Sequence, residues 1–139
     1  MKNEENRSVI QGLYAAINVK DFEYIKTLGH EKSEWFDIPF NSTTIGESSI
    51  VASWEKRFTI FPDVTYEIKN LIATDSYVIV QGIERGTHNG TLKLYEKEVE
   101  PKGTAIEVGF CDVYYLESGK ILKANSNFDV CSLLRQLAA

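Results

Sequence analysis

The spacing of hydrophobic positions changes once along this chain, near residue 64. Up to that point apolar residues recur every three or four positions, which is the spacing of amphipathic helices. Beyond it they alternate with polar residues, as in strands that are buried on one face. Helices followed by strands predict the α+β class, in which helices pack on one face of an antiparallel sheet.

The first half of the chain is expected to contain three helices and one short strand. Asp21 is a suitable N-cap for the second helix, because its side chain can accept a hydrogen bond from a free backbone N–H. The expected helices cover Glu4–Val19, Asp21–Gly29 and the stripe from Ile50 to Phe58, and the expected strand covers Trp35–Phe40. Residues 41–44 are expected to be a polar stretch that leads into the third helix, which ends at Pro62.

The second half is expected to form a strongly curved antiparallel sheet. Its four long strands cover Val64–Lys69, Tyr77–Thr87, Thr104–Leu116 and Ile121–Phe128. Residues 91–103 are rich in Lys and Glu, which indicates an exposed hairpin connection, and Ser132–Leu137 is expected to form a terminal helical turn. Strands of this length exceed what three short helices cover tightly. We therefore expect one cone-shaped domain over residues 1–139, with a pocket enclosed by the concave face of the sheet.

Composition narrows the range of partners. Aromatic residues make up 12% of the chain, which predicts a pocket for an apolar or aromatic small-molecule ligand. A formal net charge of −5 argues against a nucleic-acid partner. No apolar run approaches the roughly 20 residues that cross a membrane. The first seven residues are polar or charged apart from Met1, so we expect a cytoplasmic protein without a membrane partner.

The chain offers few metal ligands. Its two cysteines, Cys111 and Cys131, and its two histidines lie far apart in the sequence. A zinc site needs about four such ligands at close spacing. We therefore expect reduced thiols, no metal and no cofactor.

Short motifs follow one another in a characteristic order. They are Tyr14-Ala15-Ala16, Asp21-Phe22, Trp35-Phe36-Asp37, Gly46-Glu47, Phe61-Pro62-Asp63-Val64, Gly86-Thr87-His88-Asn89-Gly90, Cys111-Asp112-Val113-Tyr114, Ser118-Gly119-Lys120-Ile121, Phe128-Asp129 and Leu133-Leu134-Arg135-Gln136-Leu137. In this order and at this spacing, over nearly the whole chain, the set resembles the SnoaL-like polyketide (ester) cyclases. That family belongs to the ketosteroid-isomerase and nuclear-transport-factor superfamily of cone-shaped folds.

The resemblance implies a small-molecule pocket and a reaction that needs no cofactor. Family members usually carry a His-Trp-Asp-like run in the last strand, and in the characterised cyclases an aspartate there acts as acid/base. In this chain Ala124-Asn125-Ser126 occupies those positions, so Ser126 replaces the expected aspartate. The connection at residues 91–103 is also longer than is typical of the family.

Strand alternation indicates which acids share the concave face. Glu84 and His88 share one face of the Tyr77–Thr87 strand and its extension, and Phe110 and Asp112 share one face of the next. Because His88 and Asp112 match the family motifs, we assign these faces to the pocket. Ring closure needs a base beside a carbonyl and a donor for the enolate oxygen. We expect Asp112 or Asp37 to be the base and His88 the donor or proton shuttle.

Further residues are expected to line the pocket and bind the substrate. They are the aromatic residues Tyr14, Trp35, Trp54, Phe58 and Phe110 and the polar residues Glu84, Asn125 and Asn127. Alternation directs Ile79 and Ile83 to the opposite face of the sheet. We therefore expect a homodimer through the outer sheet face.

Two functions stay open on this evidence. The first is a cofactor-free cyclase, isomerase or hydrolase that acts on an apolar carbonyl compound, and the presence of His88 and Asp112 favours it. The second is a non-catalytic dimeric module that binds a small molecule, and Ser126 at the aspartate position favours this alternative.

Overall fold

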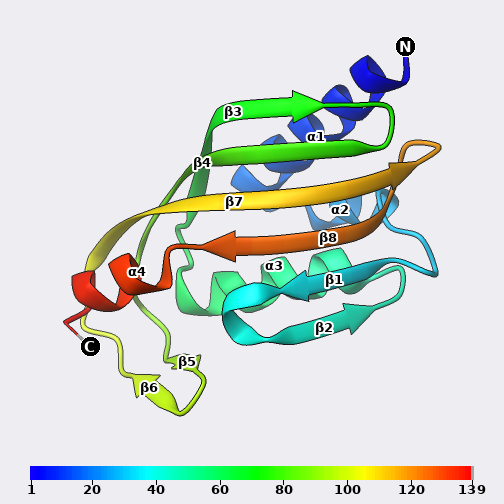
Figure 1. Ribbon diagram of the computed structural model, residues 1–139. Coiled ribbons are helices and arrows are strands. Elements are labelled where there is room, and N and C mark those ends of the chain that lie inside the picture. Colours follow the sequence, from blue (N-terminus) through cyan, green and yellow to red (C-terminus); the bar gives the residue numbers. More distant parts are fainter. Residues whose placement is uncertain (139) are drawn as a thin grey trace.

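In the computed structural model, which describes residues 1–138, the first three helices cover one face of a six-stranded sheet and the fourth lies at the end of the sheet (Figure 1). The helices are α1 (Lys2–Asn18), α2 (Phe22–Thr27), α3 (Ser49–Ile60) and α4 (Val130–Gln136). The strands of the main sheet are β1 (Glu34–Asp37), β2 (Ser42–Ile45), β3 (Thr65–Ala73), β4 (Tyr77–Thr87), β7 (Ala105–Glu117) and β8 (Lys120–Phe128). The α+β class and the cone-shaped arrangement are therefore confirmed.

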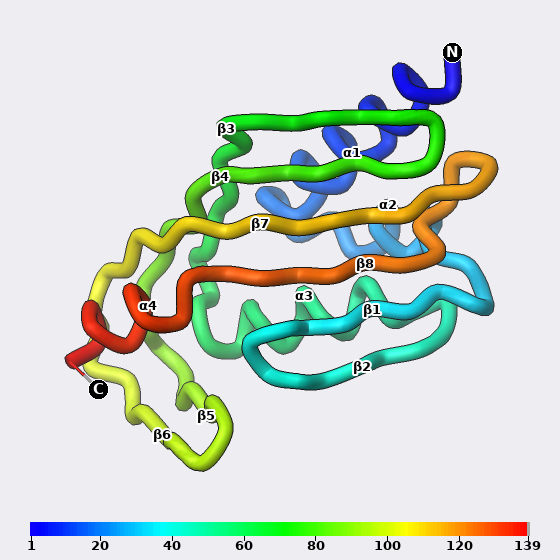
Figure 2. Tube along the Cα trace, viewed as in Figure 1, coloured from blue at the N-terminus to red at the C-terminus, as the bar shows by residue number. Residues whose placement is uncertain are grey.

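The six strands lie in the order β2-β1-β8-β7-β4-β3. Every neighbouring pair is antiparallel except β1 and β8, which run parallel, so the sheet is mixed rather than purely antiparallel as expected. The parallel pair arises because the chain leaves the hairpin of β1 and β2, crosses the sheet through α3, and returns with its last strand beside β1 (Figure 2). Residues from the two ends of the chain thereby become neighbours.

The helices form where the apolar periodicity predicts them. Ile10, Leu13 and Ile17 of α1 are fully buried, because their spacing places them on the helix face that packs against the sheet. The N-cap prediction for α2 is confirmed, since the Asp21 carboxyl accepts a hydrogen bond of 3.1 Å from the backbone N–H of Tyr24.

Two segments differ from the sequence prediction. Residues 42–45, expected to belong to a polar stretch and helix entry, form the edge strand β2, which is held by backbone pairing to β1 and so needs no apolar alternation. Residues 38–40 form a 3-10 helix (Ile38–Phe40) instead of extending β1, because Pro39 has no N–H to donate to a neighbouring strand. The connection at residues 91–103, expected to be exposed, contains a small hairpin of β5 (Leu92–Leu94) and β6 (Lys97–Val99) that projects from the sheet (Figure 1), but Leu92 and Leu94 are buried.

Aromatic rings fill the space between the concave face of the sheet and the helices. Trp54 of α3 packs on Trp35 of β1, with ring centroids 5.6 Å apart, and on Tyr66 of β3, at 5.0 Å. Tyr14 of α1 stacks on Phe110 of β7 at 5.7 Å. All five side chains are buried. The concave face is therefore aromatic, as expected, and a ligand must displace some of these rings to enter it.

Close packing at one glycine yields a first prediction. Gly82 lies on the inner face of β4, where an added Cβ would come within 2.0 Å of the Glu67 carbonyl oxygen and 2.8 Å of the Phe110 ring. Gly82→Ala should therefore lower the free energy of unfolding by about 2 kcal/mol or more. Urea unfolding followed by circular dichroism measures this loss. Gly109→Ala is the matched control, because its Cβ would lie 4.0 Å from its nearest neighbour; equal losses in the two variants would contradict the prediction.

Candidate functional site

Asp112 lies at the centre of a buried group of hydrogen-bond donors. Its side chain, on the inner face of β7, is 1% exposed. The Tyr14 hydroxyl donates to Oδ2, and the Tyr114 hydroxyl lies 3.3 Å from the same oxygen and 2.7 Å from the Tyr14 hydroxyl. Oδ1 accepts from the Ser126 hydroxyl at 2.9 Å and from the backbone N–H of Asn127 at 3.3 Å. Three elements, α1, β7 and β8, thus meet at one carboxyl group.

This environment changes the acidity of the groups in it. Burial raises the pKa of Asp112 to about 6, although the hydrogen bonds from Tyr14, Ser126 and the Asn127 backbone act in the opposite direction. Burial, followed by the proximity of the Asp112 charge, raises the pKa values of Tyr14 and Tyr114 well above the ordinary value. Near neutral pH Asp112 can therefore give or take a proton, while both tyrosines remain neutral donors.

A second carboxyl group lies in the same row across the sheet. Asp37 of β1 pairs with Ser126 of β8, which in turn pairs with Asp112 of β7. At the usual strand spacing, Asp37 and Asp112 are roughly 10 Å apart at their backbones, with Ser126 between them. The Asp37 carboxyl accepts one hydrogen bond, of 3.0 Å, from the Ser53 hydroxyl of α3. One carboxyl group surrounded by donors thus lies two strands from another that has a single side-chain donor, and such a difference in environment is suited to general acid/base chemistry.

A buried ion pair joins α3 to β4. The guanidinium of Arg57 lies 3.7 Å from the Glu84 carboxyl, and Tyr66 donates a hydrogen bond of 2.9 Å to the other oxygen of Glu84. The guanidinium carbon of Arg57 also lies 4.3 Å from the centre of the Phe128 ring. Burial lowers the pKa of Arg57, but the nearby Glu84, together with Tyr66, Asp37 and Asp112, raises it above the ordinary value. Arg57 is therefore charged.

Most of the predicted site residues lie on the concave face. Tyr14, Trp35, Trp54, Glu84 and Phe110 are all buried there, each at most 6% exposed. Asp37 and Asp112 join them, as described above. The inward orientation of Glu84, unusual for a carboxyl group, follows from the alternation of β4 and is satisfied by Arg57 and Tyr66.

Three predicted pocket residues lie elsewhere. Asn125 and Asn127 are exposed on the outer face of β8, because Ala124, Ser126 and Phe128 occupy the inner face. Phe58 packs edge-to-face on Phe22, at 5.7 Å, between α3 and α2, away from the acid groups. These three side chains do not line the concave face.

His88 is buried but distant from Asp112. Asp112 pairs with Val80, and His88 follows eight residues later along the same strand direction. That separation corresponds to up to roughly 26 Å of extended chain. The imidazole lies against the Phe61 ring, at 5.7 Å, and its Nε2 has no hydrogen-bond partner among the described residues. The structure therefore does not bring His88 and Asp112 together.

Three residues of the site were not predicted from the sequence. They are Ser53, Arg57 and Tyr66. Tyr114 shares the alternating face of Asp112, so the sequence carried a signal for it. Arg57 lies three positions after Trp54, on the same helix face, and this spacing would have been the corresponding signal.

Comparison with known proteins identifies the family of the chain. A family model described as SnoaL-like polyketide cyclase matches residues 8–137. The chain belongs to the SnoaL-like polyketide cyclase family. A search of curated proteins finds no match.

Solved structures related to this SnoaL-like protein have the same fold. A candidate SnoaL-like polyketide cyclase from Jannaschia sp. CCS1 superposes with a TM-score of 0.84 at 16% identity, over 99% of this chain and 94% of that one. IdmH, a candidate polyketide cyclase from Streptomyces antibioticus, gives 0.78 at 22% identity, over 96% and 99%. TerC, crystallised with polyporic acid, gives 0.76 at 18% identity, over 97% and 99%.

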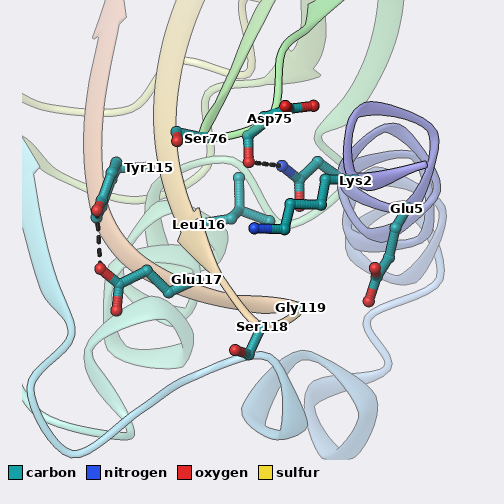
Figure 3. A pocket seen from close by; sticks show the side chains of 10 residues that line it. Lys2, Glu5, Asp75, Ser76, Tyr115, Leu116, Glu117, Ser118 and Gly119 are labelled. Atoms are coloured by element: carbon teal, nitrogen blue, oxygen red, sulfur yellow. Dashed lines mark hydrogen bonds between the residues drawn. The ribbon is translucent and has the colours of Figure 1, made fainter.

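The surface of this SnoaL-like chain carries several hollows outside the concave face. One, of about 260 Å³, lies between the start of α1 and the turns at Ser76 and Ser118, and is lined by Lys2, Glu5 and Glu117 among others (Figure 3). Its walls are mostly polar, and Asp112, Asp37 and Arg57 are not among them. We therefore place the candidate site in the aromatic interior and not in this hollow.

Two further features bear on partners of the SnoaL-like protein. Within residues 1–138, no group of three or more His, Cys, Asp or Glu side chains is placed to hold a metal ion. None of the helices in this part of the chain has the length and apolar character needed to cross a membrane.

The raised pKa of Asp112 yields a second prediction. Its ordinary pKa is 3.8 and its folded value is about 6. Between these two pH values Asp112 is protonated in the folded protein and ionised in the unfolded chain. Lowering the pH through this range therefore stabilises the folded state through Asp112. The free energy of unfolding of the wild type should therefore rise relative to that of Asp112→Asn, by on the order of 3 kcal/mol, between about pH 7 and pH 4.

Asp63 supplies a control with the opposite sign. Hydrogen bonds from Thr87 lower the pKa of Asp63, so its contribution is present at neutral pH and is lost on acidification. The difference in the free energy of unfolding between the wild type and Asp63→Asn should thus shrink as the pH falls. Urea unfolding of the three proteins across this range measures both trends, and a pH-independent difference for Asp112→Asn would contradict the assignment.

Proposed function

We propose that this SnoaL-like protein is a cofactor-free acid/base enzyme of the cyclase or isomerase type, which acts on an apolar compound that carries a carbonyl group. The observation that carries the proposal is the Asp112 carboxyl, which is buried among aromatic rings, has a pKa of about 6 and contacts two neutral tyrosine hydroxyls. Perturbed acids in an aromatic interior are characteristic of catalytic sites. The polyporic acid bound to TerC supports a small organic ligand for this fold.

The two carboxyl groups take different roles in the proposed reaction. Asp37, with one side-chain donor, removes the proton on the carbon beside the carbonyl, and the electron pair of that C–H bond moves onto the carbonyl oxygen. In its protonated form the Asp112 O–H donates to the Tyr14 hydroxyl, and the O–H of Tyr14 is then free to donate to this oxygen and stabilise its charge. The enolate carbon then either attacks a second carbonyl, which closes a ring, or takes a proton back at another carbon, which completes an isomerisation.

Tyr14 thereby takes the donor role that the sequence suggested for His88. The Tyr14 hydroxyl contacts Asp112 directly, whereas His88 lies far along β4. The assignment of the acid role to Asp112 also accounts for the presence of Ser126 at the position where the family usually has aspartate. The Ser126 hydroxyl contacts Asp112, so a carboxyl group from the neighbouring strand lies beside that position.

The alternative is a non-catalytic module that binds a small molecule. The observation that favours it is the complete hydrogen bonding of Asp112, whose oxygens have donors from Tyr14, Tyr114, Ser126 and the Asn127 backbone. In this case the carboxyl group would stabilise the fold and take no part in proton transfer.

Deuterium exchange into simple aryl ketones separates the two functions. Acetophenone, 1-tetralone and 1-indanone are incubated with the protein in deuterated buffer, and loss of the proton signal beside the carbonyl is followed by NMR. The enzyme should exchange at least one of them faster than buffer does. Asp37→Asn should lower this rate by about 10²–10⁴-fold, and Asp112→Asn should lower it as well.

Asp63→Asn is the matched control, because it removes an exposed carboxyl group from outside the concave face. Its exchange rate should equal that of the wild type. If all three ketones bind and none exchanges above the buffer rate, the binding module is the correct function.

We further propose that two copies of the chain pair through the outer face of the sheet. Support comes from Ile79, Ile83 and Val113, which are half-buried neighbours on that face. Tyr77 and Tyr115 extend the apolar area, with ring centroids 5.2 Å apart. An apolar surface of this kind on a sheet is typical of an interface between protein chains.

Light scattering at micromolar concentration tests the dimer. The mass should be twice that of the chain, and Ile79→Lys should shift it towards the monomer, because a charge in the apolar centre of an interface is costly. Gln11→Lys, on the exposed side of α1, is the control and should leave the mass unchanged. A monomeric wild type would contradict the proposal.

A further inference from the structure

Several buried N–H groups on the concave face have no acceptor. Nε1 of Trp35, Nε1 of Trp54 and Nη1 of Arg57 are buried and form no hydrogen bond with any described residue. These three atoms are always donors. The other two unpaired buried atoms of the described residues, Ser49 Oγ and His88 Nε2, can each act as donor or acceptor. Buried polar groups are nearly always satisfied, so the three unpaired donors indicate that something outside the chain supplies their acceptors.

Arg57 is the best placed of these donors. Its side chain is 8% exposed, and the 3.7 Å between Nη1 and the Glu84 carboxyl is short enough for an ion pair but too long for a hydrogen bond. The contact of the guanidinium with the Phe128 ring, at 4.3 Å, helps to hold the side chain in place. The charge of Arg57 is thus balanced while one of its N–H groups stays available.

Trp54 supplies a second donor on the same face of α3. It lies three positions before Arg57, one turn away on the helix surface. Its ring packs against Tyr66, whose hydroxyl holds the Glu84 carboxyl that pairs with Arg57. Trp54, Tyr66, Glu84 and Arg57 therefore form one connected group, which contacts the donors around Asp112 through the Tyr14 ring.

We propose that Arg57 and Trp54 bind a second carbonyl oxygen of the substrate, so that the substrate carries one oxygen at the Asp112 group and another at Arg57. This inference rests on the proposed function, because the first oxygen is the one that Tyr14 and Asp112 hold. It adds Arg57 to the site as an oxygen-binding residue and Glu84 as the residue that positions it. It also limits the substrate to compounds with two separated oxygen acceptors.

The second oxygen belongs to a neutral group. The carboxyl groups of Glu84 and Asp37 already act on the single guanidinium, apart from Asp112, which is protonated in the proposed reaction. A carboxylate on the ligand would add a further negative charge to this group and would be repelled. A ketone, ester or quinone oxygen accepts the free hydrogen bonds without that cost.

A pair of probes tests the second oxygen. Acetophenone has one ketone, and 1,4-diacetylbenzene has the same ring with a second ketone opposite the first; their dissociation constants are measured by NMR titration of the full chain. The wild type should bind 1,4-diacetylbenzene about tenfold more tightly, because its second oxygen reaches a charged donor. In the double variant Arg57→Met, Glu84→Gln the ratio should fall to about two, the statistical advantage of two equivalent ends.

The double variant removes both charges of the pair, so no unpaired charge is left buried. Its outer-face counterpart is Arg85→Met, Glu107→Gln, which removes an exposed arginine–glutamate pair 3.2 Å apart and should keep the tenfold ratio. Trp54→Phe removes the indole N–H together with part of the ring and leaves the charged pair in place. It should lower the ratio in part, which provides a test even if the double variant does not fold. The probe 4-acetylbenzoate, of the same shape but with a carboxylate, should bind no better than acetophenone.

Each result bears on the proposal. The proposal is overturned if the ratio is unchanged in the folded double variant or, where that variant does not fold, in Trp54→Phe. It is also overturned if the wild-type ratio is two or if 1,4-diacetylbenzene does not bind. Tighter binding of 4-acetylbenzoate overturns the neutral substrate class. The deuterium-exchange experiment on the ketones is independent of this test. If the affinity ratio depends on Arg57 but no ketone exchanges, the protein is a non-catalytic module that contains the oxygen subsite. If a ketone exchanges but the affinity ratio does not depend on Arg57, the proposed enzyme function is supported and the proposed oxygen subsite is overturned.

Discussion

A carboxyl group in the middle of a sheet is tolerated only where donors surround it, and at Asp112 these donors come from three different elements. Tyr14 is supplied by α1, Tyr114 by β7 and Ser126 by β8. Removing one donor would leave part of a buried carboxyl unpaired, at a cost of about 1–3 kcal/mol. The placement of α1 on the sheet and the register of β8 against β7 thus depend on Asp112, the residue to which we assign the acid role.

The ion pair of Arg57 and Glu84 fixes the position of α3 on the sheet in the same way. It joins the third helix to β4, with Tyr66 of β3 holding the far oxygen of the carboxyl. Between the two polar groups lie the rings of Trp54, Tyr14 and Phe110, which contribute apolar burial but no fixed orientation of charge. Stability and proposed function therefore depend on the same side chains, and substitutions in the site will change both.

Strand alternation predicted the inward orientation of Asp112 and Glu84, because a period of two follows directly from the geometry of a strand. It was misapplied to β8, where polar Asn125 and Asn127 were taken as pocket lining although Phe128 indicates that the even-numbered residues face inward. Alternation also reports only the face of a strand and not the distance along it, which is why His88 was grouped with Asp112. Arg57 was missed because arginine is usually exposed, and its burial depends on Glu84 from a distant strand.

The placement of the tryptophans has a consequence for observing this protein at work. Trp35 and Trp54 are the two tryptophans of the chain, and both lie in the interior with their rings in edge-to-face contact. Their emission therefore reports on the concave face alone, and a molecule that enters there has to separate or reorient these rings. Intrinsic fluorescence would record its arrival without a label, at a rate governed by side-chain motion inside the protein and not by diffusion in the solvent.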